Sequence, residues 1–264
     1  MEDWQLQIYK KSLKKKEKID LLLSALPDLA GKKCLEVGCA RGTVSHFLRS
    51  KGGSWFHADT DFSNVRAAAT LLKDGVLQVP PNVLPFPDSS FDVIVSLDYL
   101  EHVNDDQASM RELHRVLKSG GQLLISTPTT GSGYVLNKIK PFIGLTLDKY
   151  GHVREGYALA DLKGRLQKQG YEIQTACTYS RFFTEFVEMG INFAFVKILG
   201  KDMEGESGKR DGAITIGSKE SFQKHQGSMK LYSLAYPFVY AFTRLDKLLP
   251  FGGYALLIDA RKIQ

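Results

Sequence analysis

From residue 33 onward, the chain alternates between short apolar runs and longer segments whose apolar residues recur at helical spacing. We predict strands for the apolar runs, at Lys33–Val37, Ser54–Ala58, Phe91–Ser96, Gln122–Thr127, Tyr171–Cys177 and Tyr254–Ala260. The segments between them predict helices at Thr43–Ser50, Ser63–Lys73, Gln107–Val116 and Leu159–Lys168. Gly120-Gly121 is expected to end the third of these helices. Strand and helix in alternation predict an α/β fold in which crossover helices connect parallel strands.

The N-terminal segment has a different pattern. Residues 4–26 are predicted to form a helix that Pro27 closes, with an apolar stripe through Leu13, Ile19, Leu22 and Leu23. A run of lysines, Lys10–Lys18, is expected on the opposite face. We interpret this run as a solvated helix face, with a phosphate or membrane-surface contact as the alternative.

A second segment interrupts the alternation before the last predicted strand. Residues 181–252 contain two aromatic stretches separated by a glycine- and charge-rich segment, 201–212, which we expect to be a mobile loop. The sequence therefore predicts four parts. They are an N-terminal helix (1–30), a nucleoside-binding α/β domain (31–180), a helical, aromatic insertion (181–252), and the final strand of the α/β domain (253–264).

The overall composition places few limits on function. The 264 residues are 43% hydrophobic and 24% charged, which suits a globular protein with a sizeable core. A formal charge of +6 permits anionic partners but does not identify one. The three cysteines have no spacing typical of a disulfide framework or a zinc site. Without a signal-like N-terminus or a long apolar run, we expect a cytoplasmic protein with no spanning helix.

The clearest chemical signal is the turn that follows the first predicted strand. Residues 34–42 read CLEVGCARG, so an apolar strand enters a turn of small residues and a helix begins at Thr43. Glycines allow the backbone to approach a ligand, and the first N–H groups of a helix face whatever binds there. The second strand ends at Asp59, seventeen residues after Gly42 (59 − 42). A carboxylate there can accept hydrogen bonds from a ribose diol, and Asp61 is expected to cap the next helix. Together these features predict a nucleoside site.

Three blocks of sequence in this order carry a family resemblance. They are LEVGCARG at 35–42, LPFPDSSFDVIVSLDYLEHV at 84–103, and RELHRVLKSGGQLLISTP at 111–128. With them, the chain resembles the class I methyltransferases that depend on S-adenosylmethionine (SAM), in particular the ubiquinone and menaquinone biosynthetic group. The resemblance implies a Rossmann-like, mostly parallel seven-stranded sheet with helices on both faces, and SAM as cofactor. The SAM-binding residues that it implies are Glu36, Gly38, Cys39, Ala40, Arg41, Gly42, Asp59, Thr60, Asn82, Asp98 and Tyr99.

The chain departs from the family pattern at two places. Ala40 and Arg41 replace smaller residues of the usual glycine loop, and alanine fits there if its φ angle is negative. Arg41 is expected either to reach the methionine carboxylate of SAM or to face solvent. Pro80-Pro81 stands where the family usually places an acidic contact to adenine. Because proline has no N–H, Asn82 or Gln78 is expected to replace this contact.

Acid–base candidates follow the fourth and fifth strands implied by the resemblance. An imidazole titrates near neutral pH, so His102 is the first candidate for a general base and His152, in KYGHVREGY, the second. A structural or binding role is the alternative for each. The remaining histidines are scattered, and we predict no metal site.

The sequence leaves the methyl acceptor open. The aromatic insertion is interpreted either as a cover for the sheet or as a cap over an apolar or lipid-linked small molecule, with possible peripheral membrane contact. A nucleic-acid partner is disfavoured, because basic and aromatic residues are not interleaved in a recognisable module. A nicotinamide enzyme is disfavoured because the loop lacks G-x-G-x-x-G. A SAM-binding module without catalysis, acting as a partner subunit, remains the alternative to an active enzyme.

Overall fold

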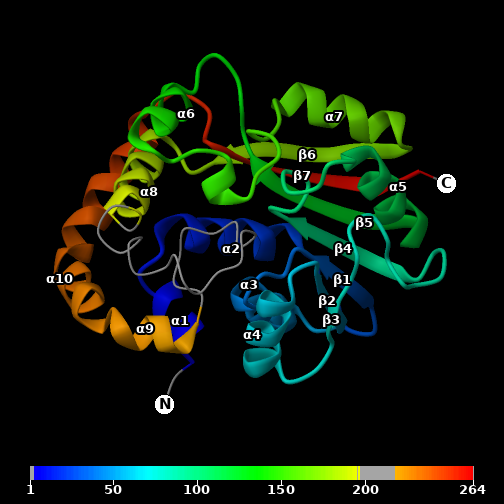
Figure 1. Cartoon of the computed structure of the whole chain (residues 1–264). Helices are drawn as coiled ribbons and strands as arrows, with labels where there is room; N and C mark the ends of the chain where they lie inside the picture. The colour runs from blue at the N-terminus through cyan, green and yellow to red at the C-terminus, as the bar shows by residue number, and fades with distance from the viewer. Residues whose placement is uncertain (1–2, 195, 197–217, 264) are drawn as a thin grey trace.

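The computed structural model describes residues 3–194, 196 and 218–263, which build a seven-stranded sheet with helices on both faces (Figure 1). The strand order is β3-β2-β1-β4-β5-β7-β6, and β7 runs antiparallel to both β5 and β6. The strands are β1 (Lys33–Val37), β2 (Ser54–Asp59), β3 (Val76–Gln78), β4 (Phe91–Leu97), β5 (Leu117–Pro128), β6 (Tyr171–Tyr179) and β7 (Ala255–Lys262). The predicted Rossmann-like, mostly parallel sheet is confirmed.

Both faces of the central strands are buried, which explains why these strands read as nearly continuous apolar runs. In β5, Leu123 and Ile125 join one core while Leu124 joins the other. The first core is completed by helices α5 (Asp106–Val116) and α7 (Leu159–Lys168), the second by α2 (Leu13–Ala25) and α3 (Thr43–Leu48). Helix α4 (Phe62–Leu72) packs beside α3. The sheet is therefore a rigid platform whose strand ends position the loops.

Six of the seven strands lie where the apolar pattern predicts them, and the differences have local causes. The missed strand, β3, has only three residues and no buried side chain, so its pattern is weak. The prediction that Gly120-Gly121 ends a helix was wrong. Helix α5 ends at Val116, and β5 begins at Leu117, because Leu117 already pairs with Phe91 of β4. Both glycines therefore lie inside β5.

The N-terminal segment also differs from its prediction. The single helix predicted over 4–26 is two helices, α1 (Trp4–Tyr9) and α2, because Ser12 caps α2 by accepting a hydrogen bond from the Lys15 N–H at 3.4 Å. The interpretation of the lysine run as a solvated face was wrong for Lys14 and Lys18. Lys18 is only 9% exposed and pairs with Asp98, and Lys14 pairs with Glu185.

The segment between β6 and β7 forms a helical layer at the left of Figure 1. It contains α8 (Phe182–Ala194), α9 (Lys219–Lys224), α10 (Gln226–Thr243) and the 3₁₀ helix η6 (Arg244–Leu248). Helix α8 contacts α2, α10, η6 and α6 (Val135–Ile139). The loop predicted over 201–212 lies outside the described residues. Among the described helices, none has the length and apolarity needed to cross a bilayer.

Three short 3₁₀ helices complete the described elements, namely η1 (Arg49–Lys51), η2 (Lys140–Ile143) and η3 (Asp148–Tyr150). Helix η2 follows α6 directly, and η3 precedes the turn that carries His152. Helices α6, η2 and η3 belong to the long connection from β5 to α7, which passes over the carboxyl end of the sheet (Figure 1).

Candidate functional site

The glycine loop joins β1 to α3 and needs glycine at two positions. Gly38 and Gly42 have φ angles of +85° and +82°, a region that other L-residues rarely adopt. A Cβ at position 38 would lie 2.3 Å from the Leu97 carbonyl oxygen. A Cβ at position 42 would lie 3.1 Å from the Ala68 Cα. The loop backbone is therefore held closely between β4 and α4.

Ala40 corrects one expectation from the sequence. Its φ is +46°, whereas a negative value was expected for alanine at this position. The left-handed conformation costs an L-residue about 1–2 kcal/mol. In compensation, the Ala40 N–H donates a hydrogen bond of 2.8 Å to the Asp59 carboxylate.

Asp59, at the end of β2, connects the second strand to the glycine loop. One carboxylate oxygen accepts from the Ala40 N–H, and the other accepts from the Asp61 N–H at 3.0 Å. Burial raises the pKa of Asp59 above its ordinary value, although these hydrogen bonds oppose the shift. The predicted cap is confirmed, because the Asp61 side chain accepts from the Ser63 and Asn64 N–H groups. Thr60 lies between the two aspartates, and the Gln78 side chain donates to its carbonyl oxygen at 3.1 Å.

Glu36 is fully buried in a pair that the sequence did not indicate. Its Oε2 lies 2.6 Å from His57 Nδ1, and Arg49 donates to His57 Nε2 at 3.0 Å. Because arginine can only donate, Nε2 must accept, so Nδ1 carries the proton and donates to Glu36. The second oxygen of Glu36 is buried and has no hydrogen-bond partner among the described residues.

Asn82, the residue expected to replace the adenine contact, meets Tyr99 and Ser109 beside β4. The Tyr99 hydroxyl accepts a hydrogen bond of 3.3 Å from the Asn82 N–H, and the Ser109 hydroxyl donates to the Asn82 side-chain oxygen. These residues, with Val37 and Val83, line a small hollow. Asn82 has a φ of +62°, which asparagine tolerates better than most residues. The turn after Pro80-Pro81 thus presents Asn82 to the end of β4.

Asp98 follows the last residue of β4 and forms an ion pair with Lys18 of α2. Burial opposes ionisation of Asp98, but the adjacent Lys18 ammonium holds its pKa below the ordinary value. Lys18 is a site residue that sequence reasoning missed. A lysine run normally indicates a solvated face, and no local pattern distinguishes Lys18 and Lys14, which turn inward, from the other members.

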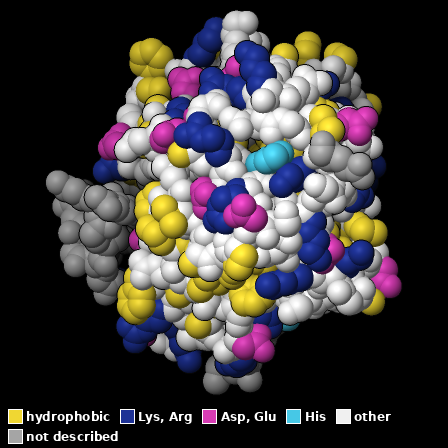
Figure 2. Space-filling model, turned by 90° about the vertical axis from the view of Figure 1, so that its right-hand side faces the viewer, with side chains coloured by type: hydrophobic (Ala, Val, Ile, Leu, Met, Phe, Trp, Pro, Cys, Tyr) yellow, Lys and Arg dark blue, Asp and Glu magenta, His cyan; other side chains and the backbone are white. Residues whose placement is uncertain are grey.

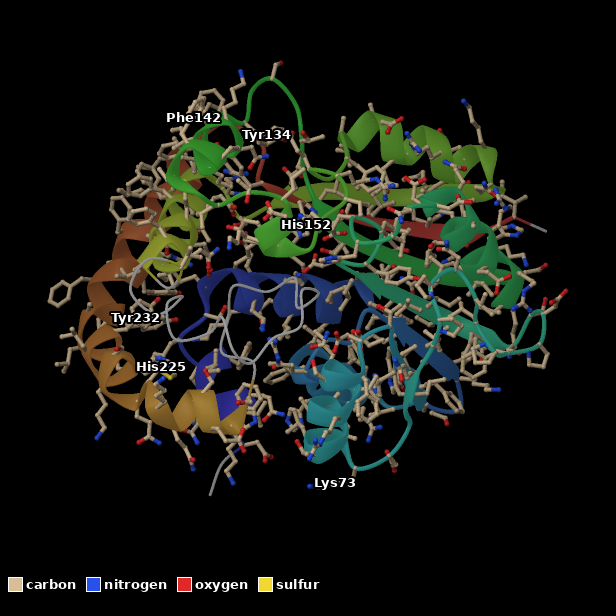
Figure 3. The ribbon with its side chains drawn as sticks, viewed as in Figure 1. Lys73, Tyr134, Phe142, His152, His225 and Tyr232 are labelled. Carbon is tan, nitrogen blue, oxygen red and sulfur yellow. The ribbon has the colours of Figure 1, made fainter. Side chains whose placement is uncertain are left out.

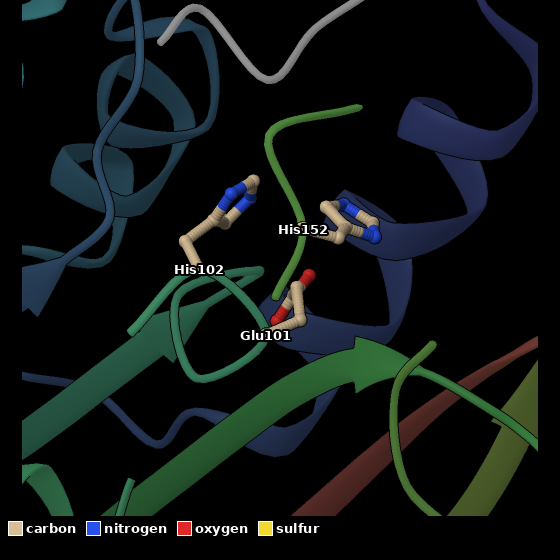
Figure 4. A group of neighbouring side chains, drawn as sticks. All are labelled: Glu101, His102 and His152. Atoms are coloured by element: carbon tan, nitrogen blue, oxygen red, sulfur yellow. The ribbon is translucent and has the colours of Figure 1, made fainter. Parts of the chain in front are cut away.

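Glu101, His102 and His152 converge on one space above the carboxyl ends of β4 and β5 (Figure 4). Their potential ligand atoms all lie within 4.8 Å of one another. The two imidazole rings meet edge to face, with centroids 4.7 Å apart. Glu101 is buried and accepts a hydrogen bond of 3.0 Å from the Thr127 hydroxyl. The sequence predicted no metal site because His152 is far from the other two residues along the chain. The structure brings together three groups that can bind a cation or exchange protons.

Two groups of this cluster have shifted pKa values. Burial and the nearby Asp98 carboxylate raise the pKa of Glu101 to about 8, so the carboxyl is largely protonated at neutral pH. Burial and His102 lower the pKa of His152 to about 3, so that ring is neutral. His102 Nδ1 lies 3.0 Å from the Gly151 carbonyl oxygen. A carbonyl can only accept, so Nδ1 carries a proton, and in the neutral ring the lone pair is on Nε2.

A buried ionic network lies beside this cluster. Glu185 of α8 accepts from Lys14 of α2 at 3.1 Å and from Lys140 of η2 at 2.7 Å. Although burial opposes ionisation, the two ammonium groups lower the pKa of Glu185 to about 2. The Ser180 hydroxyl, at the end of β6, also donates to Glu185 at 3.1 Å. The network therefore ties α2, α8 and η2 together.

Comparison with known proteins points to one family. Residues 35–125 match the model of a family described as a methyltransferase domain. The ubiquinone biosynthesis O-methyltransferase of Pseudomonas syringae pv. tomato is 30% identical over 126 residues, which are 42% of this chain and 54% of that protein. The ubiquinone/menaquinone biosynthesis C-methyltransferase of Shewanella oneidensis is 32% identical over 120 residues, 41% of this chain and 47% of that protein. The chain thus spans about half the length of the curated relatives that it matches.

Solved structures share the fold over most of the chain. The YcgJ protein from Bacillus subtilis has a TM-score of 0.59 at 19% identity, covering 94% of this chain and 99% of that one. Phosphoethanolamine N-methyltransferase 2 of Haemonchus contortus, in complex with SAM, has a TM-score of 0.57 at 19% identity, covering 94% and 53%. The resemblance predicted from the three sequence blocks is confirmed.

Proposed function

We propose that this protein transfers a methyl group from SAM to a small-molecule acceptor. One observation carries the proposal, namely that the predicted cofactor residues of β1, β2 and β4 meet at one point of the sheet. Between β1 and β4 the strand order reverses, and ligands of open α/β sheets bind outside the carboxyl ends of the strands at such a point. The domain match over residues 35–125 covers these strands.

The residues present suit SAM. The loop that contains Gly38 and Gly42 forms a cradle of close backbone, and added Cβ atoms there would collide with neighbouring elements. Asp59 would hold the ribose diol, with Thr60 beside it. Asp98 and Tyr99 would border the methionine end, and Asn82 would replace the missing acidic contact to adenine. Glu36, Cys39, Ala40, Arg41 and Gly42 complete the proposed set. Bound SAM supplies a methyl group that is already activated for displacement.

His102 is the residue we propose as general base for a hydroxyl acceptor. The hydrogen bond from its Nδ1 to the Gly151 carbonyl fixes the tautomer, and Nε2 can then accept the acceptor's proton. His152 packs against this ring and is neutral, so it does not repel the imidazolium that forms. Holding the acceptor oxygen in line with the methyl group, at about 3–3.5 Å, supplies much of the remaining rate.

We assign the substrate cap to residues 181–252, inserted between β6 and β7 of the domain at 31–180 and 253–264. The described part of this segment contacts α2 and α6 through α8, next to the His102 cluster. The names of the curated relatives support a small, quinone-related acceptor. Replacing 184–250 with a short Gly/Ser linker should preserve SAM binding and abolish methylation. Normal methylation by the shortened protein would contradict the cap.

SAM binding by two aspartate variants tests the core of the proposal. Asp59→Ala should weaken SAM binding by roughly 1.5–3 kcal/mol, the range for hydrogen bonds that involve a charged group. Asp61→Ala is the matched control, because it removes the cap of α4 and leaves the Asp59 carboxylate in place. Calorimetry on both folded variants measures the difference. Wild-type affinity in Asp59→Ala would overturn the assignment, and SAM binding without transfer to any quinol or lipid extract would favour the non-catalytic module.

A further inference from the structure

The outer face of α10 carries an apolar stripe that is exposed to solvent. Leu231, Leu234 and Phe238 are 71%, 75% and 79% exposed, at intervals of three and four residues that place them on one side of the helix. The stripe continues through Phe242 near the end of α10, through Leu245 and Leu248 of η6, and to Phe251 beyond it. A surface helix normally directs such residues into the core, so this face is the reverse of the usual pattern.

The opposite face of α10 already has its partners, so a rotation of the helix cannot hide the stripe. The Tyr232 hydroxyl donates to the Lys11 carbonyl at 3.2 Å, and the Tyr236 hydroxyl accepts from Lys16 at 3.0 Å. Thr243, the last residue of α10 before η6, is buried. Figure 1 shows α10 along the outer left edge of the molecule, and Figure 3 labels Tyr232 on it.

The apolar surface extends from α10 onto α8. Phe242 of α10 packs against Phe183 of α8, with ring centroids 5.0 Å apart. Within α8, the Phe182 ring lies 5.5 Å from that of Phe183 and 6.2 Å from that of Phe186. Phe182 and Phe186 are themselves 36% and 47% exposed. We call a set of exposed hydrophobic side chains of α8, α10 and η6 the apolar face. It consists of Phe182, Phe186, Leu231, Leu234, Phe238, Phe242, Leu245 and Leu248. Large contiguous surfaces of this kind mark interaction sites in monomeric proteins.

The exposed charged side chains of α10 and η6 all have one sign. Between residues 226 and 248 the exposed charged side chains are Lys230, Arg244 and Lys247. The acidic residue of this range, Asp246, is buried and accepts hydrogen bonds from the Phe183 and Thr184 N–H groups. The side of the molecule shown in Figure 2 differs, because its basic side chains are mixed with acidic ones.

We propose that the apolar face of α8, α10 and η6 docks on an anionic lipid membrane, with α10 lying in the plane of the interface. An amphipathic helix with leucine and phenylalanine on one face and flanking cations inserts that face at the boundary between headgroups and acyl chains. Lys230, Arg244 and Lys247 would contact lipid phosphates, which attract basic side chains near the surface. The proposal concerns a surface outside the SAM-binding residues and holds whether or not methyl transfer occurs.

Vesicle binding by the full chain tests the proposal. The wild-type protein should co-sediment with vesicles of equal parts phosphatidylcholine and phosphatidylglycerol. Far less protein should co-sediment with vesicles of phosphatidylcholine alone. Leu234→Ser/Phe238→Ser should lower the partition coefficient at least about tenfold, because both side chains lie on the proposed buried face. Ile263→Ser is the matched control, since Ile263 is 55% exposed on the strand end beyond β7 and should bind as wild type.

Charge reversal separates the two contributions. Lys230→Glu/Lys247→Glu should reduce binding to the anionic vesicles several-fold and weaken its dependence on salt, while leaving SAM affinity unchanged. Failure of the wild-type protein to sediment would overturn the proposal, as would equal binding by Leu234→Ser/Phe238→Ser. A concentration-dependent dimer that this double variant abolishes would assign the face to a second copy of the chain and would also overturn it.

Discussion

The proposed cofactor side of the site and its proposed acceptor side are held together by different interactions. On the cofactor side, β1, β2 and the glycine loop are joined by backbone hydrogen bonds and one carboxylate, Asp59, that accepts from loop N–H groups. On the acceptor side, α2, α8 and η2 are joined by buried ion pairs between Lys14, Lys140 and Glu185. The cofactor side depends on backbone conformation. The acceptor side depends on ion pairs between residues that only the folded chain brings together.

The difference shows which side tolerates substitution. A backbone cradle fails when a single Cβ is added, since its neighbours are main-chain atoms that cannot move independently. A buried ion pair fails when one partner is removed, because the remaining charge loses its compensation. Variants on the two sides should therefore differ in whether pH modulates their effect.

The largest effect is expected on the cofactor side, for Gly38→Ala. The new Cβ would lie 2.3 Å from the Leu97 carbonyl oxygen at a φ of +85°, so unfolding should become easier by about 3 kcal/mol or more. Gly120→Ala is the control, because Gly120 has a φ of +71° but nothing within 4 Å of a Cβ. That variant should lose only the conformational cost of about 1–2 kcal/mol. If urea unfolding shows equal losses of stability in the two variants, the contact between the new Cβ and the Leu97 carbonyl adds no cost at Gly38.

Glu185→Gln should produce the next largest effect, and it should depend on pH. The folded pKa of Glu185 is about 2 against an ordinary value of 4.5, which corresponds to about 3 kcal/mol of stability. Because the folded pKa is depressed, this contribution is present above about pH 4.5 and is lost as pH falls toward 2. Wild type and variant should therefore differ at neutral pH and converge in acid. Parallel stability curves across this range would contradict the ionic role.

A smaller loss, confined to turnover, is expected for His102→Ala. General-base catalysis contributes about a hundredfold or more, so turnover should fall by that factor while SAM affinity stays near wild type. His102→Asn is the informative companion, because its side-chain amide can still donate to the Gly151 carbonyl but offers no basic nitrogen. Full activity in the asparagine variant would show that His102 only positions the loop.

Ala40→Gly should produce the smallest change, in the stabilising direction. Glycine relieves the left-handed strain at a φ of +46°, although it also increases the freedom of the unfolded chain. We expect a gain of up to about 1 kcal/mol in the free energy of unfolding, with the Ala40 N–H still bonded to Asp59. Thermal unfolding measures this change, and a clear loss of stability would show that the alanine side chain contributes packing.

The sequence by itself determined the sheet and the cofactor side. Central strands buried on both faces produce apolar runs, which is why β1 and β4 were predicted at nearly their observed bounds. The glycine turn and Asp59 were recognised because backbone conformation restricts residue type locally, at Gly38 and Gly42 above all. Short β3 was missed because three partly exposed residues leave no such pattern.

Only the tertiary structure decided the acceptor side. Lys18 and Lys14 belong to a run that looks solvated, and their inward orientation follows from where α2 packs against Asp98 and Glu185. Glu101 and His152 are remote in sequence, and the loop before α7 brings them together. Charge pairing across such distances leaves no periodic signal, because an ionic partner is selected by position in space and not by spacing along the chain.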